Sequence, residues 1–165
     1  MIVRRLTDTD VNAFKSIRLE ALKTEPDAFA SSYDEALKLG DEDWRARLTQ
    51  PIVVAAFDDT GTPRGLMGVI RQPYTQMAHR GSLVMVYVAP DARRGGTARK
   101  MLAFIEAEAR QAGIDQIELE VRADNAAAIR FYETAGYQTY GQLPRAARSQ
   151  TGECDDLLMV RHLDA

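Results

Sequence analysis

The sequence contains very little of the chemistry that builds crosslinked or metal-rich proteins. Among its 165 residues there is one cysteine, Cys154, and there are two histidines, His79 and His162. A lone cysteine cannot form an internal disulfide, and two histidines far apart in the sequence argue against a zinc or similar metal site. We therefore expect no metal, and a fold that is stabilised by its hydrophobic core alone.

Long hydrophobic runs and an excess of basic charge are also missing. No apolar segment approaches the roughly 20 residues of a membrane-spanning helix, and the N-terminus has neither the apolar region nor the cleavage pattern of a signal peptide. The 21 basic and 24 acidic residues leave a net charge of −3, which argues against the broad basic face of a nucleic-acid-binding domain. We expect a cytoplasmic protein with no membrane or nucleic-acid partner.

The composition is that of an ordinary globular protein. Hydrophobic residues make up 45% and charged residues 27% of the chain, close to the average for globular domains. A chain of this length buries roughly 68–70% of its unfolded surface, which is enough for a core without covalent crosslinks. Because there is no repeat, linker or low-complexity tract, we expect one domain over residues 1–165.

Strand and helix signals alternate along the chain. Hydrophobic runs bounded by turn residues predict strands over residues 2–6, 52–57, 65–71, 82–88, 117–121, 137–143 and 156–163. Apolar residues at helical spacing predict helices from residue 11 to just before Pro26, around Trp44, over 97–112 and over 125–135. This order predicts an α/β fold (an α+β mixed sheet) of about seven mostly antiparallel strands and about four helices.

The densest chemical signal lies where the strand over 82–88 runs into a glycine-rich turn and then a helix. The stretch reads Arg93-Arg-Gly-Gly-Thr-Ala-Arg-Lys100. Such a turn lets consecutive backbone N–H groups point into one concavity, and the helix N-terminus adds free donors and the positive end of its dipole. The spacing is neither a P-loop nor G-x-G-x-x-G. It predicts a site for a multiply charged phosphate ligand; the alternative is a solvated basic helix start.

Two motifs in this region resemble those of the GCN5-related N-acetyltransferases. Residues 93–98 match the family signature R/Q-x-x-G-x-G/A, and residues 125–137 are similar to its second motif, N-x-x-A-x-x-F-Y-x-x-x-G-F/Y. Their order and spacing along the chain also agree with the family. The resemblance implies a fold whose central parallel strand pair is splayed, and acyl transfer from acetyl-CoA to an amine.

The resemblance also implies which residues hold the cofactor. The amides of residues 94–98 would bind the pyrophosphate, with basic side chains nearby. Free backbone groups of Val86 and Val88 would pair with the pantetheine arm like an added strand, and one of these N–H groups could stabilise the reacting carbonyl oxygen. The residues expected to bind the cofactor are Val86, Val88, Arg93, Arg94, Gly95, Gly96, Thr97, Ala98, Arg99, Asn125 and Tyr132.

Tyr132 matches the family's usual general acid. Attack by an amine expels a thiolate whose conjugate acid has a pKa of roughly 8.5, and a phenol with a pKa of ~10 can protonate it. The alternative is a core aromatic residue whose hydroxyl is bound locally. Asn125 matches a cofactor-contacting asparagine, and it is also a favoured helix N-cap; both roles can hold together.

The general base is less well marked. Many relatives carry a glutamate on the central strand, but here the matching stretch, residues 83–86, contains no acid. Glu118 and Glu120 share one face of the next strand, and Glu120 lies nearer its end, which makes it our candidate base. A solvated strand face is the alternative reading. Asp34, Glu35 and His79 are further candidates, and a water chain or an acceptor of low pKa would need no direct base.

The acceptor site varies within the family. We expect Phe29, Ser32 and Tyr33 to form its wall; the alternative is ordinary packing of a connecting segment. The expected activity is transfer of an acetyl group to a primary amine of a small molecule or peptide, by direct attack in a ternary complex. The alternatives are a non-catalytic acyl-CoA sensor and an acetyltransferase of protein N-termini or lysines. A homodimer, common among relatives, stays an open alternative.

Overall fold

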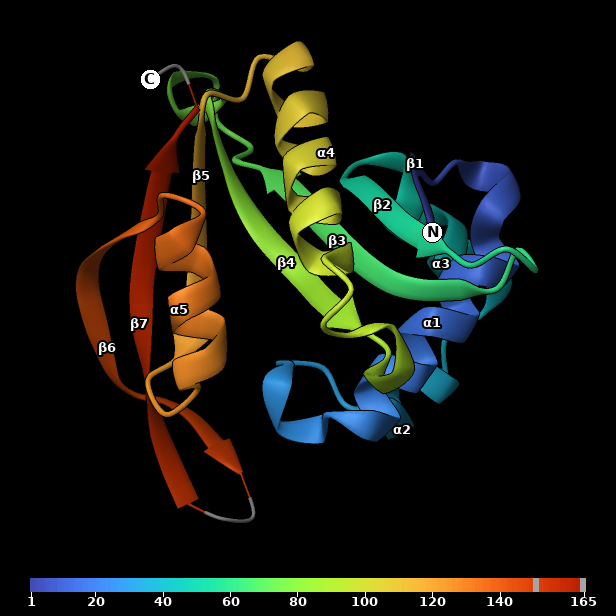
Figure 1. Cartoon of the computed structure of the whole chain (residues 1–165), viewed down its shortest axis with the longest axis horizontal. Coiled ribbons are helices and arrows are strands. Elements are labelled where there is room, and N and C mark those ends of the chain that lie inside the picture. The colour runs from blue at the N-terminus through green and yellow to red at the C-terminus, as the bar shows by residue number, and fades with distance from the viewer. Residues whose placement is uncertain (150–151, 164–165) are drawn as a thin grey trace.

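The strands form one mixed sheet. The structure is a computed structural model that describes residues 1–149 and 152–163. Neighbouring strands follow the order β1-β2-β3-β4-β5-β7-β6, and all are antiparallel except the central pair β4 and β5 (Figure 1). The strands are β1 (Ile2–Arg5), β2 (Ile52–Phe57), β3 (Pro63–Arg71), β4 (Arg80–Val88), β5 (Gln116–Arg122), β6 (Gln138–Ser149) and β7 (Gly152–His162). The predicted mixed sheet of seven strands is confirmed.

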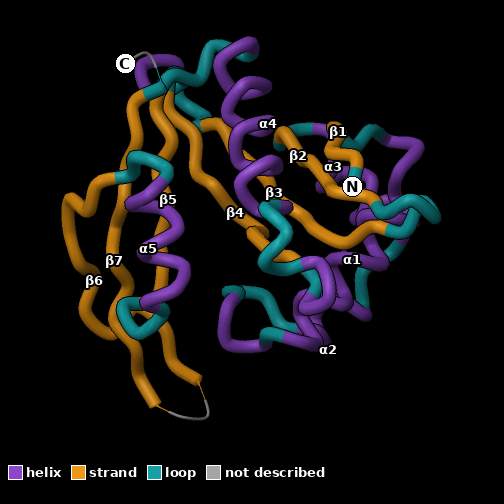
Figure 2. The backbone as a smooth tube through the Cα atoms, in the orientation of Figure 1, coloured by secondary structure: helices purple, strands orange, loops and turns teal. Residues whose placement is uncertain are grey.

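Helices cover both faces of this sheet. They are α1 (Val11–Thr24), α2 (Tyr33–Leu37), α3 (Asp41–Thr49), α4 (Thr97–Gln111) and α5 (Ala126–Thr134). Helices α4 and α5 lie on one face, and α1, α2 and α3 lie toward the other (Figure 2). The four longer helices are those that the sequence predicts, and α2 is a short fifth one. Its N-cap Ser32 accepts a hydrogen bond from the amide of Glu35, and the Glu35 carboxylate bonds back to the amide of Ser32.

The hydrophobic core is divided by the sheet into two clusters. On the α4 side, Met101 and Ile105 pack on Ile117 and Leu119 of β5. On the α1 side, Phe14 meets Trp44 edge to face, with ring centroids 5.6 Å apart. Strand β2 is buried along its whole length, because its alternate side chains enter both clusters.

A β-bulge in β4 opens the centre of the sheet. Leu66 of β3 pairs with Tyr87 and Gly68 pairs with Val84, so one residue of β3 faces two of β4, and Met85 adopts a positive φ of 57°. Strand β4 pairs with β5 only over residues 80–82. Beyond these residues the two strands diverge, which leaves a V-shaped gap that Figure 1 shows in front view. The expected splayed parallel pair is therefore present.

A buried ion pair ties α4 to the strands beyond this gap. Glu106 of α4 is 4% exposed and accepts hydrogen bonds from Arg161 of β7, at 2.8 and 2.9 Å, and from the Tyr137 hydroxyl at 3.1 Å. The pKa of Tyr137 is raised, first by burial of the phenol and second by the negative charge of Glu106. The carboxylate thus joins α4 to the part of the sheet that contains β7, which is connected to β4 only through the short pairing of β4 with β5.

We expect Glu106→Ala to lower the free energy of unfolding by about 3 kcal/mol, because it leaves a partly buried guanidinium and a buried phenol unpaired. Urea denaturation followed by circular dichroism measures this. Glu108→Ala is the matched control on the same helix, since Glu108 bonds Arg5 at the surface at 3.3 Å and such pairs contribute less than about 1 kcal/mol. Equal losses in the two variants would contradict the role given to Glu106.

Candidate active site

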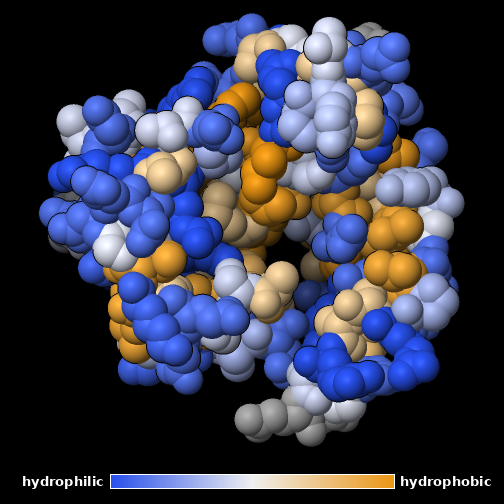
Figure 3. All heavy atoms as spheres, turned by 180° about the vertical axis from the view of Figure 1, so that it is seen from behind, coloured by the Kyte–Doolittle hydropathy of each residue, from blue (hydrophilic) through white to orange (hydrophobic). Residues whose placement is uncertain are grey.

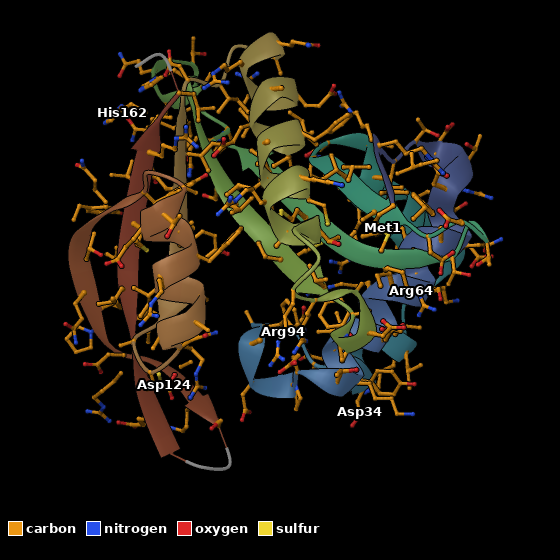
Figure 4. The ribbon with its side chains drawn as sticks, in the orientation of Figure 1. Met1, Asp34, Arg64, Arg94, Asp124 and His162 are labelled. Atoms are coloured by element: carbon orange, nitrogen blue, oxygen red, sulfur yellow. The ribbon has the colours of Figure 1, made fainter. Side chains whose placement is uncertain are left out.

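The end of β4 leads into a turn lined with unpaired backbone amides. Among the described residues, none of the amides of residues 94–99 donates a hydrogen bond to the protein; the first helical bond is from Lys100 to the Gly96 carbonyl, at 3.0 Å. Arg94 and Gly96 both have positive φ, 66° and 76°, and this geometry turns successive N–H groups toward one side. Arg94 lies at this turn, at the N-terminal end of α4 (Figure 4).

The space over this turn is open to a ligand. A Cβ atom built on Gly95 or on Gly96 would meet no protein atom within 4 Å. Glycine at position 96 is therefore not required by close packing of the protein itself. It is favoured by the left-handed backbone, and its missing side chain leaves the amides uncovered. Unpaired donors, an uncovered surface and the positive end of the α4 dipole together fit a pyrophosphate group.

The basic side chains of the turn do not all face the amides. Arg93 donates to the Val88 carbonyl at 2.9 Å and to Glu25, the C-cap residue of α1, at 2.8 Å, so it braces the end of β4 against the C-terminal end of α1. Arg94 is exposed and has no hydrogen bond within the described part of the chain. Arg99 is also exposed and lines a groove of about 330 Å³ between α4 and α5, together with Phe131.

Tyr132 lies in the hydrophobic cluster on the α4 side of the sheet. Its side chain is 6% exposed and makes edge contacts with Phe131 and Tyr137, at centroid distances of 5.2 and 5.7 Å. Burial raises its pKa above the ordinary value for tyrosine. Its hydroxyl forms no hydrogen bond with any residue that the structure describes. The phenol therefore stays protonated, and its proton is not held by the protein.

Asn125 caps helix α5. Its side-chain oxygen accepts a hydrogen bond from the amide of Ala128 at 3.1 Å. The residue is exposed, and within the described residues its amide nitrogen has no hydrogen-bond partner. The cap thus satisfies the helix and leaves an amide donor available at the end of the helix that carries Tyr132.

Two glutamates of β5 lie on the face of the sheet opposite Tyr132. Alternation along β5 places Ile117, Leu119 and Val121 against α4 and α5, and so turns Glu118 and Glu120 to the other face. Glu118 is ion-paired with Arg80, whose Nη2 lies 2.8 Å from Oε2, and this contact lowers its pKa. Glu120 is exposed and makes no hydrogen bond or ion pair within the described ranges. Of the two, only Glu120 has a carboxylate that is free to accept a proton.

A second carboxylate, that of Asp156, lies on the same face as Glu120, and no sequence pattern indicates a role for it. Asp156 of β7 pairs in register with Arg122 and therefore shares its face with Glu120. Its Oδ1 is buried with no hydrogen-bond partner in the described structure, and burial raises its pKa. Asp156 lies on a strand whose alternation is ordinary, so only the three-dimensional packing distinguishes it.

On the same face, α1, α2 and α3 enclose a pocket of about 510 Å³ against β3 and β4. This side of the molecule is hollowed near its centre (Figure 3). Of the three expected wall residues, none lines the pocket directly. Phe29 stacks against the guanidinium of Arg18 at 4.5 Å, Ser32 caps α2, and Tyr33 packs on the α1-side cluster. Arg18, which does line the pocket, follows ordinary helical spacing in the sequence and was not marked by it.

Within residues 1–149 and 152–163, no three or more histidine, cysteine or acidic side chains gather in a way that could hold a metal ion. No helix in the same ranges has both the length and the apolar character that crossing a bilayer requires.

Comparison with known proteins agrees with this geometry. The model of the acetyltransferase (GNAT) family matches residues 14–137. The chain is 29% identical over 161 residues to the N-terminal acetyltransferase B complex catalytic subunit naa20 of Schizosaccharomyces pombe, an alignment that covers 96% of this chain and 82% of that protein.

Solved structures show the same fold. A GNAT-family acetyltransferase from Streptococcus pneumoniae superposes with a TM-score of 0.86 at 21% identity, covering 98% of both chains. An acetyltransferase from Salmonella typhimurium, solved with its cofactor acetyl-CoA, gives 0.80 at 22% identity, covering 100% of this chain and 95% of that one. The family match spans both motifs, the splayed strands and the amide-lined turn, and the chain therefore belongs to the GNAT family of acetyltransferases.

Proposed function

We propose that this protein transfers the acetyl group of acetyl-CoA to a primary amine of a small molecule or peptide, by direct attack in a ternary complex. Acetyl-CoA as the acyl donor fits the family to which the chain belongs. The observation that carries the proposal is the continuity of the unpaired edge of β4 with the unpaired amides of residues 94–99. One arm of a ligand can add to the strand edge while its phosphates reach the helix N-terminus.

When bound, the thioester supplies an activated acyl carbon and a thiol leaving group. The residues around it then have separate tasks. The amides of residues 94–98 hold the pyrophosphate, and the freed backbone of Val86 lies along the arm. The other proposed cofactor contacts are the amide of Asn125 and the exposed guanidinium groups of Arg94 and Arg99. Arg93 acts indirectly, because it fixes the end of β4 through Val88.

The two proposed proton transfers involve groups on both faces of the sheet. A bond forms between the amine nitrogen and the acetyl carbon, and the carbon–sulfur bond breaks. Tyr132, on the α4 face, gives its proton to the departing sulfur, for which a phenol that burial keeps protonated is suited. Glu120, on the opposite face, accepts a proton from the attacking amine. The proposed acid and the proposed base thus lie on opposite faces of the sheet.

The test of this function is the release of free thiol from acetyl-CoA, measured against a mixed panel of amines, amino acids and short peptides. Acceptor-dependent release establishes the transferase. Binding of acetyl-CoA without release from any acceptor would instead favour an acyl-CoA sensor, a reading to which the missing acid on residues 83–86 of β4 lends support. Release with peptides alone would place the chain with the protein N-terminal acetyltransferases, to one of which it is 29% identical.

Glu120 gives a pH-dependent prediction. An amine with a pKa near ~10.4 is protonated at neutral pH and must lose its proton before attack. We expect Glu120→Gln to lower kcat/KM for the acceptor about 10-fold at pH 7. The deficit should close as the pH approaches the pKa of the amine, because the free base then needs no acceptor for its proton.

A pH–rate profile of wild type and Glu120→Gln checks this prediction. Glu133→Gln, on the exposed side of α5, is the control and should follow the wild-type curve. A deficit that stays constant up to pH 10 would contradict the role of Glu120 as base. Asp156→Asn then becomes the next variant, since Asp156 shares this face and has an unpartnered carboxylate oxygen.

A further inference from the structure

The pocket on the α1 face is lined both by apolar side chains and by charged or polar side chains. Apolar side chains form most of the lining, among them Phe14, Trp44, Val84 and Met85, and the guanidinium groups of Arg18 and Arg47 add positive charge. A volume of about 510 Å³ is within the range of small-molecule sites. We call this cavity, defined by these six residues, the Arg18 pocket.

Arg18 is buried, and none of the residues that the structure describes acts as its counter-ion. Its side chain is 9% exposed, Nη2 donates to the Ser31 hydroxyl at 2.9 Å, and Nη1 is buried with no partner among the described residues. No acidic group within the described chain forms an ion pair with it. Burial and the nearby charge of Arg47 lower its pKa to about 10. A buried guanidinium without an acid is costly, and proteins rarely keep one unless something else compensates the charge.

The other polar groups of the pocket do not supply the missing acceptor. The Nε1 of Trp44 is also buried without a partner in the described structure, so the unsatisfied atoms here are both donors. Glu35 lines the same cavity, but its carboxylate accepts from the amide of Ser32 at 2.8 Å in the α2 cap. No acceptor of the pocket within the described chain therefore reaches Arg18 Nη1, and a planar anion is the group that fits a guanidinium fork.

The pocket also lies next to the proposed reaction centre. Val84 and Met85 belong to the β4 bulge, at the point where β4 leaves β5. The neighbouring Val86 packs on the opposite, α4-side cluster. The Arg18 pocket therefore reaches the strand that forms one side of the V, and we expect an acceptor anchored in it to present its amine to this gap.

We propose that the acceptor is a small amine that also carries a carboxylate, an amino acid or a close analogue, and that Arg18 binds its carboxylate. The inference rests on the proposed acetyl transfer and specifies its substrate class. The apolar wall favours acceptors with a hydrophobic side chain. Arg18 is a binding residue here, and it takes no part in moving protons.

Matched acceptor pairs test the proposal. Leucine, methionine and phenylalanine are compared with their carboxamides, which keep the amine and the side chain but lose the anion. In wild type we expect the acids to be acetylated with a KM about 10- to 100-fold lower than that of the amides, as expected for a hydrogen bond to a charged partner. In Arg18→Gln the KM of the acids should rise to that of the amides, with the KM of acetyl-CoA unchanged.

Two further variants separate binding from folding. Arg18→Lys keeps the charge but not the planar fork or the stacking on Phe29, and should show an intermediate KM. Arg45→Gln, an exposed arginine of α3 outside the pocket, is the control and should behave as wild type. Thermal melting of each variant shows whether it is folded. A folded Arg18→Gln whose KM for the acids is unchanged would overturn the proposal.

Calorimetric titration with the same acids and amides, without acetyl-CoA, keeps this test independent of turnover. Binding of the acids that is lost in Arg18→Gln supports the pocket even if no thiol is released, in which case only the proposed transferase fails. Equal turnover of acids and amides would contradict the carboxylate site in the Arg18 pocket, while the proposed acetyl transfer would still be supported.

Discussion

Replacing Tyr132 by phenylalanine is expected to lower kcat about 100-fold, because a positioned general acid contributes about 10²–10⁴ to the rate. The change removes one oxygen and keeps the ring that packs between Phe131 and Tyr137. The KM for acetyl-CoA should change little, since the hydroxyl has no partner in the described structure. Steady-state kinetics with a saturating acceptor measure both quantities.

The pH dependence separates Tyr132 from other groups. Burial raises its pKa above ~10, so the phenol should remain protonated throughout the working range. We therefore expect no falling limb in the wild-type profile below pH 10. Phe131→Leu is the control for ring packing, because it disturbs the same aromatic cluster and leaves the hydroxyl in place. If Tyr132→Phe keeps wild-type kcat, or loses no more than this control, Tyr132 is a core residue and the leaving thiolate departs unaided.

The second large effect is expected from Gly96→Glu. The substitution puts a carboxylate over the unpaired amides of residues 94–99 and forces a left-handed backbone, φ 76°, on a residue with a Cβ. Like charges in contact with a pyrophosphate cost several kcal/mol. Affinity for CoA should fall at least about 100-fold, a loss of about 2.7 kcal/mol, as measured by calorimetric titration.

Gly61→Glu is a close control for this change. Gly61 has nearly the same backbone conformation, φ 80°, and a Cβ there also meets no atom within 4 Å. It lies in the turn between β2 and β3, away from the unpaired amides. Gly61→Glu therefore adds the same backbone strain and the same charge as Gly96→Glu, but outside the proposed phosphate site. CoA affinity that is unchanged in Gly96→Glu, or lowered equally in both variants, would remove the phosphate site from this turn.

The fold could be predicted from the sequence where periodicity and turn chemistry agree. The stripe that includes Met101 and Ile105 predicts α4, and the alternation over 117–121 predicts β5; both are observed. The last hairpin is longer than predicted. Pro144 and its neighbours resemble a loop, yet β6 continues to Ser149 past an irregularity between Leu143 and Ala147. An edge strand tolerates a proline because its outer side needs no hydrogen bond.

The sequence predicts only the part of the site that main-chain atoms form. The glycine-rich turn before α4 has a sequence signature, since its donors are main-chain amides. Arg18 and Asp156 have none, because their unpaired atoms result from packing between distant segments. Arg93 shows the same limit in reverse: its place in the motif suggests a phosphate contact, while its side chain contacts Glu25 at the C-cap of α1.

The bulge at Met85 has a genetic consequence. Because β4 carries one more residue than β3 between their paired positions, loss of that single codon would restore an uninterrupted ladder. Val84 and Met85 both lie on the α1 side of the strand, and alternation has a period of two. The side chains beyond the deletion would therefore keep the faces that they have now. Val86 would stay in the α4-side cluster, opposite Met67, and the strand would be free to straighten toward β5. An in-frame deletion here would thus close the gap between β4 and β5 while keeping every motif of the sequence intact.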